Sequence, residues 1–247
     1  MHFLLQKNIW GEYGYDRFVD SVIRAGISYQ MVNSIPFTEE FDEEITHEPD
    51  HCFGSTRFIN VCRKKGMKVF PTFYPGAFEM FPKEHWINGD GYVSKWGELD
   101  ITRPVFIKPF TEKFFTGKVV EQNSDLEQIQ LSTSFIEDEK EELIMVSECV
   151  NIKTEVRFFV LNGGVITGSG YRSDGNAHHF KISCLHPSWG AAEAILKSVI
   201  KGDVDAGFTL DLGLVEGEWK IVELNNLNSA GFYESDTDAL VRAIAHS

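Results

Sequence analysis

Two carboxylates and an amide in the stretch FTLDLGLVEGEWKIVELNN have a spacing that brings them together. Glu216-Gly217 is a turn signal between two apolar runs, which predicts a β-hairpin. Because side chains alternate between the faces of a strand, Glu223, Asn225 and Ile221 share one face of the return strand. The turn sets Asp211 next to Glu223 across the ladder. Such oxygen ligands suit a Mg²⁺ ion that bridges nucleotide phosphates, and a solvated hairpin face is the alternative.

A second polar group lies in the stretch ECVNIKTEVRFFVLNGGVITGSGYR, where Asn and Gly signal another tight turn. With a two-residue loop, Glu155 pairs with Gly170 and Arg157 with Gly168, and Arg172 shares their face. Glycines leave room for a flat polyanion, and guanidinium groups hold phosphate oxygens in a fork. We therefore expect a phosphate-binding floor, with a surface salt-bridge ladder as the alternative.

A lysine closes the strand that opens the stretch VFIKPFTEKFFTGKVV. A buried ammonium at Lys108 is costly unless an anion meets it, and extension of the side chain to solvent is the alternative. Lys113 and Thr116-Gly117 follow in the loop before the next strand. The sequence contains neither GxxxxGK[ST] nor GxGxxG, so it predicts neither a P-loop nor a dinucleotide-binding turn.

The elements that position these residues belong to an acidic chain of 247 residues with a formal net charge of -14. This charge disfavours duplex nucleic acid and a polybasic membrane contact as partners. No apolar run approaches the roughly 18 residues of a membrane span, and no secretory signal is evident. The four cysteines lack metal-site and CxxC spacing and are expected to be reduced, which favours a cytoplasmic protein.

The N-terminal part predicts a β-α-β unit. His2–Gln6 and Ile27–Val32 have the pattern of buried strands, and Tyr15–Ala25 has apolar residues at helical spacing. This order implies a parallel sheet. A further strand is expected at Lys68–Phe70, and residues 1–75 are expected to form a small α/β subdomain.

From Pro104 onward the pattern changes to hairpins with a few helices, which predicts mainly antiparallel pairing. Residues 76–103 carry Pro, Gly and Trp without clear period and are expected to connect the two parts. The C-terminal part, 104–247, is divided into subdomains at 104–150 and 151–247.

Taken in order, these segments resemble the ATP-grasp superfamily, and within it a phage-enriched clade named for one arginine and two lysines. The motifs that carry the resemblance are Lys108-Pro109, Lys113, Phe115-Thr116-Gly117, Glu155 with Arg157, Tyr171-Arg172, Glu223-Leu224-Asn225 and Ser229 to Tyr233. The resemblance covers about residues 104–247. It implies the α+β ATP-grasp fold, in which a small N-terminal α/β parallel-sheet subdomain precedes two α+β subdomains that clasp ATP between antiparallel sheets.

The resemblance also implies roles for single residues. The implied ATP-binding residues are Lys108, Lys113, Thr116, Gly117, Glu148, Cys149, Val150 and Glu155. The first would hold the phosphates, the next three would belong to the loop that covers them, the following three would form a hinge whose backbone reads adenine, and the last would bind the ribose hydroxyls. The loop is rich in Phe and Lys, whereas the superfamily pattern is rich in Gly.

For catalysis, the resemblance implies that Arg157 and Arg172 stabilise phosphate charge in the transition state. Asp211, Glu223 and Asn225 would bind Mg²⁺. The implied activity is an ATP-dependent ligase that joins a carboxylate to an amine through an acyl-phosphate and releases ADP and phosphate. A kinase acting on a hydroxyl and a nucleotide-binding module without turnover are the alternatives. The expected partners are ATP, a carboxylate and an amine, and the aromatic-rich segments are compatible with a homodimer face.

Overall fold

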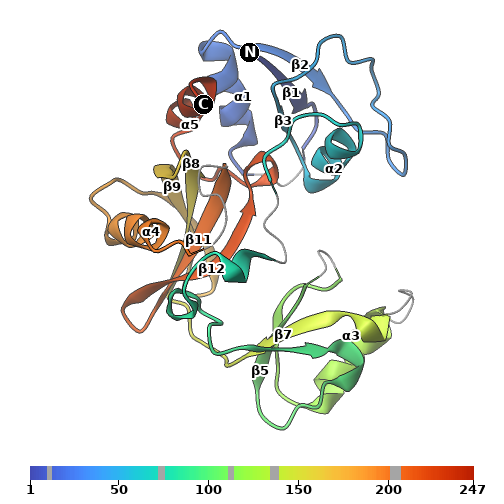
Figure 1. Ribbon diagram of the computed structural model, residues 1–247, viewed down its shortest axis with the longest axis vertical. Coiled ribbons are helices and arrows are strands. Elements are labelled where there is room, and N and C mark those ends of the chain that lie inside the picture. The colour runs from blue at the N-terminus through green and yellow to red at the C-terminus, as the bar shows by residue number, and fades with distance from the viewer. Residues whose placement is uncertain (10–12, 72–75, 111–113, 134–138, 201–206) are drawn as a thin grey trace.

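The computed structural model describes residues 1–9, 13–71, 76–110, 114–133, 139–200 and 207–247. In this part of the chain, three β-sheets follow one another along the long axis of the molecule (Figure 1). One sheet is parallel and two are antiparallel, so the expected α+β class is confirmed. Among the described residues, none of the helices combines the length and the apolar character that a bilayer crossing requires.

The N-terminal sheet is parallel and has the order β2-β1-β3. Its strands are β1 (His2–Gln6), β2 (Ser28–Val32) and β3 (His51–Phe53), with α1 (Tyr15–Arg24) between the first two and α2 (Thr56–Lys64) after the third. The predicted β-α-β opening is therefore confirmed. The side chain of Ser55 caps α2 by accepting a hydrogen bond from the Phe58 amide.

The strand expected at Lys68–Phe70 does not form. Its backbone groups pair with side chains: the Phe70 amide donates to Asn228 Oδ1, and Asn226 Nδ2 donates to the Phe70 carbonyl. The third strand of the sheet is β3, which follows the acidic loop. Asparagine amides can replace the partners of a ladder, a substitution that an apolar pattern does not reveal.

The central sheet is antiparallel, in the order β10-β9-β8-β11-β12. It consists of β8 (Thr154–Leu161), β9 (Gly164–Ser173), β10 (Asn176–Lys181), β11 (Phe208–Val215) and β12 (Glu218–Asn226). One face carries Val156, Phe158, Val160, Leu210 and Leu212, which pack against α4 (Pro187–Lys197).

The small sheet is antiparallel, in the order β4-β7-β5-β6. Its strands are β4 (Tyr92–Lys95), β5 (Val105–Pro109), β6 (Lys118–Val120) and β7 (Leu143–Ser147), and α3 (Asn123–Thr133) covers one face. Short 3-10 helices lie at Gly76–Glu79, Lys83–His85, Trp96–Glu98, Glu139–Glu141 and Leu227–Ser229.

The expected connector, residues 76–103, requires a correction. Residues Tyr92–Lys95 of that segment form β4, which pairs with β7 along its whole length. Trp96 is almost completely buried in the core of the small sheet. The small sheet therefore begins before Pro104, and the absence of periodicity in this segment concealed a short edge strand.

One core joins the N-terminal unit to the central sheet. Phe3 and Phe18 pack with Phe159 of β8 and Phe232 in the same buried cluster. The helix α5 (Thr237–Ala245) completes this cluster and lies against α1 (Figure 1). The N-terminal sheet is thereby fixed on the face of the central sheet that does not contact α4.

Candidate active site

The β11–β12 hairpin turns at Glu216 and Gly217, whose φ angles are 51° and 90°. Positive φ at both central residues is typical of the turns that join antiparallel strands tightly. An unbroken register from this turn would set Asp211 opposite Val222. The register instead shifts between Asp211 and Leu212, so that Asp211 lies opposite Glu223. The expected meeting of the two carboxylates is confirmed, and a β-bulge produces it.

The same bulge makes the expected position of Ile221 wrong. Ile221 pairs with Leu212 and is completely buried in the core beneath the sheet, whereas Glu223 lies on the opposite face. An additional residue on one strand interrupts the two-residue alternation, and turn chemistry alone does not predict it.

Asp211, Glu223 and Asn225 come together on the face of the central sheet away from α4. Asp211 is completely buried. The Asn225 amide nitrogen lies 2.9 Å from Glu223 Oε1 and 3.5 Å from Asp211 Oδ2. Arg157 donates to Asp211 through Nε at 2.8 Å and through the terminal nitrogen at 2.7 Å. The four side chains form one continuous polar network.

This donor set fits a magnesium ion. Each Asp211 oxygen accepts one bond from Arg157 and keeps a further lone pair, and rotation of the Asn225 amide would present its carbonyl oxygen. Two carboxylates and an amide oxygen are hard ligands of the kind Mg²⁺ prefers. Nowhere in the described ranges do three or more His, Cys, Asp or Glu side chains gather in a way suited to a metal ion, so the amide is an essential part of the set.

The two carboxylates have different electrostatic environments. Burial raises the pKa of Asp211, and the Arg157 guanidinium acts against this increase. Burial also acts to raise the pKa of Glu223, but Lys108 and the Asn225 amide outweigh it, so this pKa lies below its ordinary value. Asp211 thus depends on a single cation for its charge, whereas Glu223 has several compensating partners.

Lys108 reaches this network from the small sheet. It lies on β5, and its Nζ is 2.7 Å from Glu223 Oε2 on β12. Both side chains are about one third exposed. The anion that the sequence required for this strand-end lysine is, in this structure, Glu223 of another sheet.

Glu155 and Arg172 meet at the end of the β8–β9 hairpin. Their backbones pair, and Arg172 donates to Glu155 Oε1 at 2.9 Å. The Tyr171 hydroxyl donates to the other carboxylate oxygen at 2.9 Å. Burial, followed by the charges of Asp211 and Glu155, raises the pKa of Tyr171, so that the hydroxyl stays protonated as a donor.

The expected pairing of Glu155 with Gly170 and of Arg157 with Gly168 is wrong. Two register shifts in the hairpin pair Glu155 with Arg172 and Arg157 with Ser169. The glycines face the core: a Cβ at Gly168 would collide with Phe158, and one at Gly170 with Phe180. They make space for aromatic side chains, and the floor expected for a polyanion does not include them.

The remaining candidate residues surround the small sheet. Glu148, Cys149 and Val150 follow β7 and lead to β8; all are exposed, and Glu148 pairs with Arg103 at 2.9 Å. Gly117 lies close to the Phe106 ring, and Thr116 is exposed. Lys113 lies outside the described residues.

Comparisons with known proteins identify the family. Residues 91–243, more than half of the chain, match the model of the ATP-grasp domain of family 2 in the clade named for one arginine and two lysines. The chain belongs to this ATP-grasp family. A search of curated proteins found no matching sequence.

Solved structures show the same ATP-grasp fold. A crystal structure of the D-cycloserine synthetase DcsG matches with a TM-score of 0.65 and 12% identity, over 100% of this chain and 99% of that one. An ATP-grasp RimK domain protein from Sphaerobacter thermophilus DSM 20745 matches with a TM-score of 0.62 and 11% identity, over 99% and 100%. D-alanine–D-alanine ligase from Bacillus anthracis, complexed with ATP, matches with a TM-score of 0.57 and 11% identity, over 100% and 96%.

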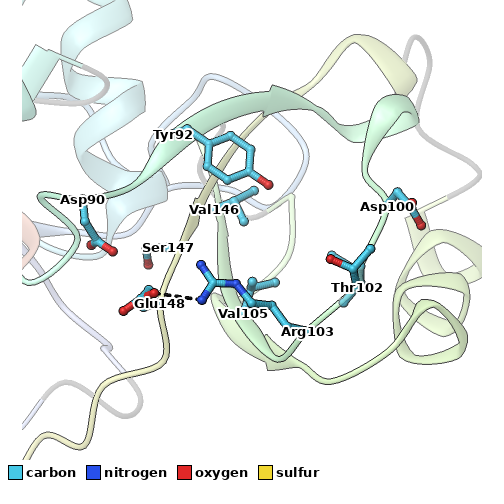
Figure 2. Close-up of a pocket in the computed structure, with 10 residues that line it drawn as sticks. Asp90, Tyr92, Asp100, Thr102, Arg103, Val105, Val146, Ser147 and Glu148 are labelled. Carbon is cyan, nitrogen blue, oxygen red and sulfur yellow. Dashed lines mark hydrogen bonds and ion pairs between the residues drawn. The ribbon is translucent and has the colours of Figure 1, made fainter.

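This ATP-grasp chain also has a hollow beside the expected hinge (Figure 2). Its lining residues are Asp90, Tyr92, Asp100, Ile101, Thr102, Arg103, Val105, Val146, Ser147 and Glu148. Arg103 points across it to Glu148 (Figure 2). Val105 and Val146 face the core under α3, and strand alternation places Lys108 on the other face of the sheet. Of the expected site residues, the hollow includes Glu148 alone.

Sequence reasoning assigned no role to two tyrosines of this ATP-grasp site. Tyr171 bonds to Glu155, and the rings of Tyr171 and Tyr233 both lie against the Arg157 guanidinium. The signal available in the sequence was their position: Tyr171 precedes Arg172 directly, and Tyr233 ends the Ser229 to Tyr233 motif.

Proposed function

We propose that this chain is an ATP- and magnesium-dependent ligase that joins a carboxylate to an amine through an acyl-phosphate. The observation that carries the proposal is the network in which Asp211, Glu223 and Asn225 of the central sheet meet Lys108 of the small sheet. Carboxylate ligands from one sheet and a phosphate-binding cation from the other form the two sides of a site for a metal-bound nucleotide.

In this proposal the side chains divide the work of binding and charge neutralisation. Asp211, Glu223 and Asn225 hold Mg²⁺, which supplies charge neutralisation at the phosphate oxygens when bound. Lys108 exchanges Glu223 for a phosphate oxygen. Arg157 stabilises the charge that develops on the transferred phosphoryl group.

The flanking residues then position the nucleotide. Glu155 binds the ribose hydroxyls and Arg172 contributes to the phosphate site. The backbone of Glu148 to Val150 reads the adenine, and the loop with Lys113 and Thr116-Gly117 covers the phosphates. The division into residues 1–75, a connector and two clasping subdomains belongs to the same proposal, with the small sheet beginning at Tyr92.

Membership of the ATP-grasp family supports ATP as the nucleotide. Two proteins with the same fold are by their names a D-alanine–D-alanine ligase and a D-cycloserine synthetase, which favours ligation over other phosphoryl transfers. In the proposed reaction a substrate carboxylate oxygen takes the terminal phosphoryl group as its bond to ADP breaks. The amine nitrogen then bonds to the acyl carbon as phosphate leaves. An ATP-consuming ligase of this kind fits a cytoplasmic protein.

The test is to incubate the protein with ATP, Mg²⁺ and pools of amino acids and small carboxylates, and to quantify ADP, AMP and phosphate. We expect ADP and phosphate to form in equal amounts and only with a productive pool. Glu223→Gln should abolish the reaction. The matched control is Glu218→Gln, on the same strand, because the Glu218 side chain is 75% exposed and lies outside the network.

Three other results would contradict the proposal. AMP with pyrophosphate would indicate adenylation of the carboxylate. ADP with a stable phosphorylated product and no free phosphate would indicate a kinase. Tight ATP binding without turnover in any pool, including pools of peptides and RNA-linked amines, would indicate a nucleotide-binding module.

A further inference from the structure

Four aromatic side chains from separate segments meet beside Arg157. The rings of Tyr13 and Tyr233 are 5.8 Å apart with an interplanar angle of 22°, and those of Tyr233 and Tyr171 are 5.3 Å apart at 17°. His179 lies 4.5 Å from Tyr13 and 5.0 Å from Tyr233. Offset stacks of this kind are favourable aromatic contacts. They form a column, here called the tyrosine column, from the exposed Tyr13 inward to Arg157.

The inner end of the tyrosine column rests on the Arg157 guanidinium. Its central carbon is 5.7 Å from the Tyr171 ring centre and 5.6 Å from the Tyr233 ring centre. The Asp211 carboxylate binds one edge of the guanidinium through two hydrogen bonds. A guanidinium has five N–H donors, so donors remain after this pairing. The carboxylate fixes one edge of the group and the two rings fix its face.

Tyr233 has a backbone conformation that a tyrosine seldom adopts, with a φ of 46°. Of the other non-glycine residues with positive φ in the described ranges, Asn162, Asp174 and Glu216 each open a tight hairpin turn. Tyr233 lies outside any hairpin. Strained backbone at such a position persists only when its surroundings enforce it, and it often accompanies a functional site.

The residues before α1 enforce this conformation. The Tyr13 carbonyl accepts hydrogen bonds from the amides of Phe232 at 2.8 Å and Tyr233 at 3.0 Å. Gly14 follows with a φ of 81°, and a Cβ there would lie 2.8 Å from the Tyr233 carbonyl oxygen. Glycine is therefore required for the close approach of the two backbones. Tyr13 and Gly14 together clamp Tyr233.

We propose that Tyr233 is a positioning residue for Arg157. The clamp of Tyr13 and Gly14 holds Tyr233 in its left-handed conformation, and its ring orients the guanidinium so that the free donors face the terminal phosphate of ATP. The inference rests on the proposed function, because it assigns that phosphate to Arg157. It adds that the N-terminal unit, through two residues, sets the geometry of the phosphate site.

The test compares the affinities of MgATP and MgADP by calorimetry in the wild type, Tyr233→Leu and Tyr233→Phe. Leucine keeps apolar bulk but has no aromatic face, and phenylalanine keeps the face. We expect Tyr233→Leu to lose about tenfold of the preference for MgATP over MgADP, because a buried cation–π contact is lost, while its MgADP affinity stays within about twofold. Tyr233→Phe should retain the wild-type preference.

A second variant tests the clamp independently of the ring. Gly14→Ala places a methyl group against the Tyr233 carbonyl and should reduce the preference for MgATP in the same direction. An unchanged preference in Tyr233→Leu and Gly14→Ala overturns the inference and leaves the proposed function intact. Equal weakening of both nucleotides also overturns it, since that result indicates packing alone. A wild-type protein that binds neither nucleotide overturns the proposed function, and the inference with it.

Discussion

Lys108 and Glu223 lie on different sheets and are joined by an ion pair of 2.7 Å. Neither sheet provides both partners, so this pair closes the space between the two sides of the candidate site. In the proposed reaction each side chain has another partner: a phosphate for the lysine and Mg²⁺ for the carboxylate. Binding of the metal–nucleotide complex is thus an exchange of ion pairs, in which no charge has to be left without a partner.

Removal of the lysine should therefore weaken nucleotide binding. Lys108→Met should raise the Kd of MgATP by about tenfold or more, because a charge-assisted bond to phosphate is lost. Lys118→Met is the matched control, since Lys118 lies on the adjacent strand β6 and is exposed. Calorimetric titration measures both. Equal affinities in the two variants would exclude Lys108 from the phosphate site.

The depressed pKa of Glu223 predicts a pH dependence of stability. A carboxyl whose folded pKa is below its unfolded value stabilises the protein above the unfolded value and loses that contribution as pH falls through the folded one. The Tm of the wild type should consequently fall more steeply than that of Glu223→Gln between about pH 5 and about pH 3. Thermal unfolding across this range measures the difference. Parallel curves would show that Glu223 gains nothing from Lys108.

The buried pair of Arg157 and Asp211 predicts strong coupling. Asp211→Leu alone leaves a buried guanidinium without its carboxylate and should cost about 3–5 kcal/mol of unfolding free energy. The double variant Arg157→Met with Asp211→Leu should recover most of this loss, because neither charge then remains unpaired. Urea unfolding of the two single variants and the double variant gives the coupling energy. Additive losses would mean that the two side chains act independently.

The expected hinge can be tested with the thiols of the chain. Cys149 and Cys184 are both exposed, so iodoacetamide should label each. Burial and the neighbouring Glu121 and Glu148 raise the pKa of Cys149, so its labelling should accelerate as pH increases. MgATP should slow the labelling of Cys149 several-fold and leave that of Cys184 unchanged. Peptide mass spectrometry separates the two sites, and equal rates at Cys149 with and without nucleotide would remove it from the adenine site.

Local sequence chemistry predicted the hairpins and the meeting of Asp211 with Glu223. Turn residues with positive φ, such as Glu216 and Gly217, specify where a hairpin reverses, and strand alternation then groups side chains by face. These signals depend on a few consecutive residues. For that reason they could be read without knowledge of the tertiary structure.

The bulges could not be predicted in this way. The shift beside Asp211 and those in the β8–β9 hairpin depend on the packing of several strands. The true role of Gly170 depends on Phe180 of a neighbouring strand. The pair of Lys108 with Glu223 joins residues 115 positions apart, and no local pattern encodes such a separation.

The core shared by the N-terminal sheet and α5 determines when the protein can finish folding. Phe3 and Phe18 pack with Leu240 and Val241 of α5 in one buried cluster. During synthesis, the β-α-β unit therefore emerges more than two hundred residues before the helix that covers it. Its apolar face must stay exposed, or be covered by a chaperone, until α5 has been made, since contacts so distant in sequence form late. Completion of the site, including the clamp on Tyr233, is accordingly a post-translational event.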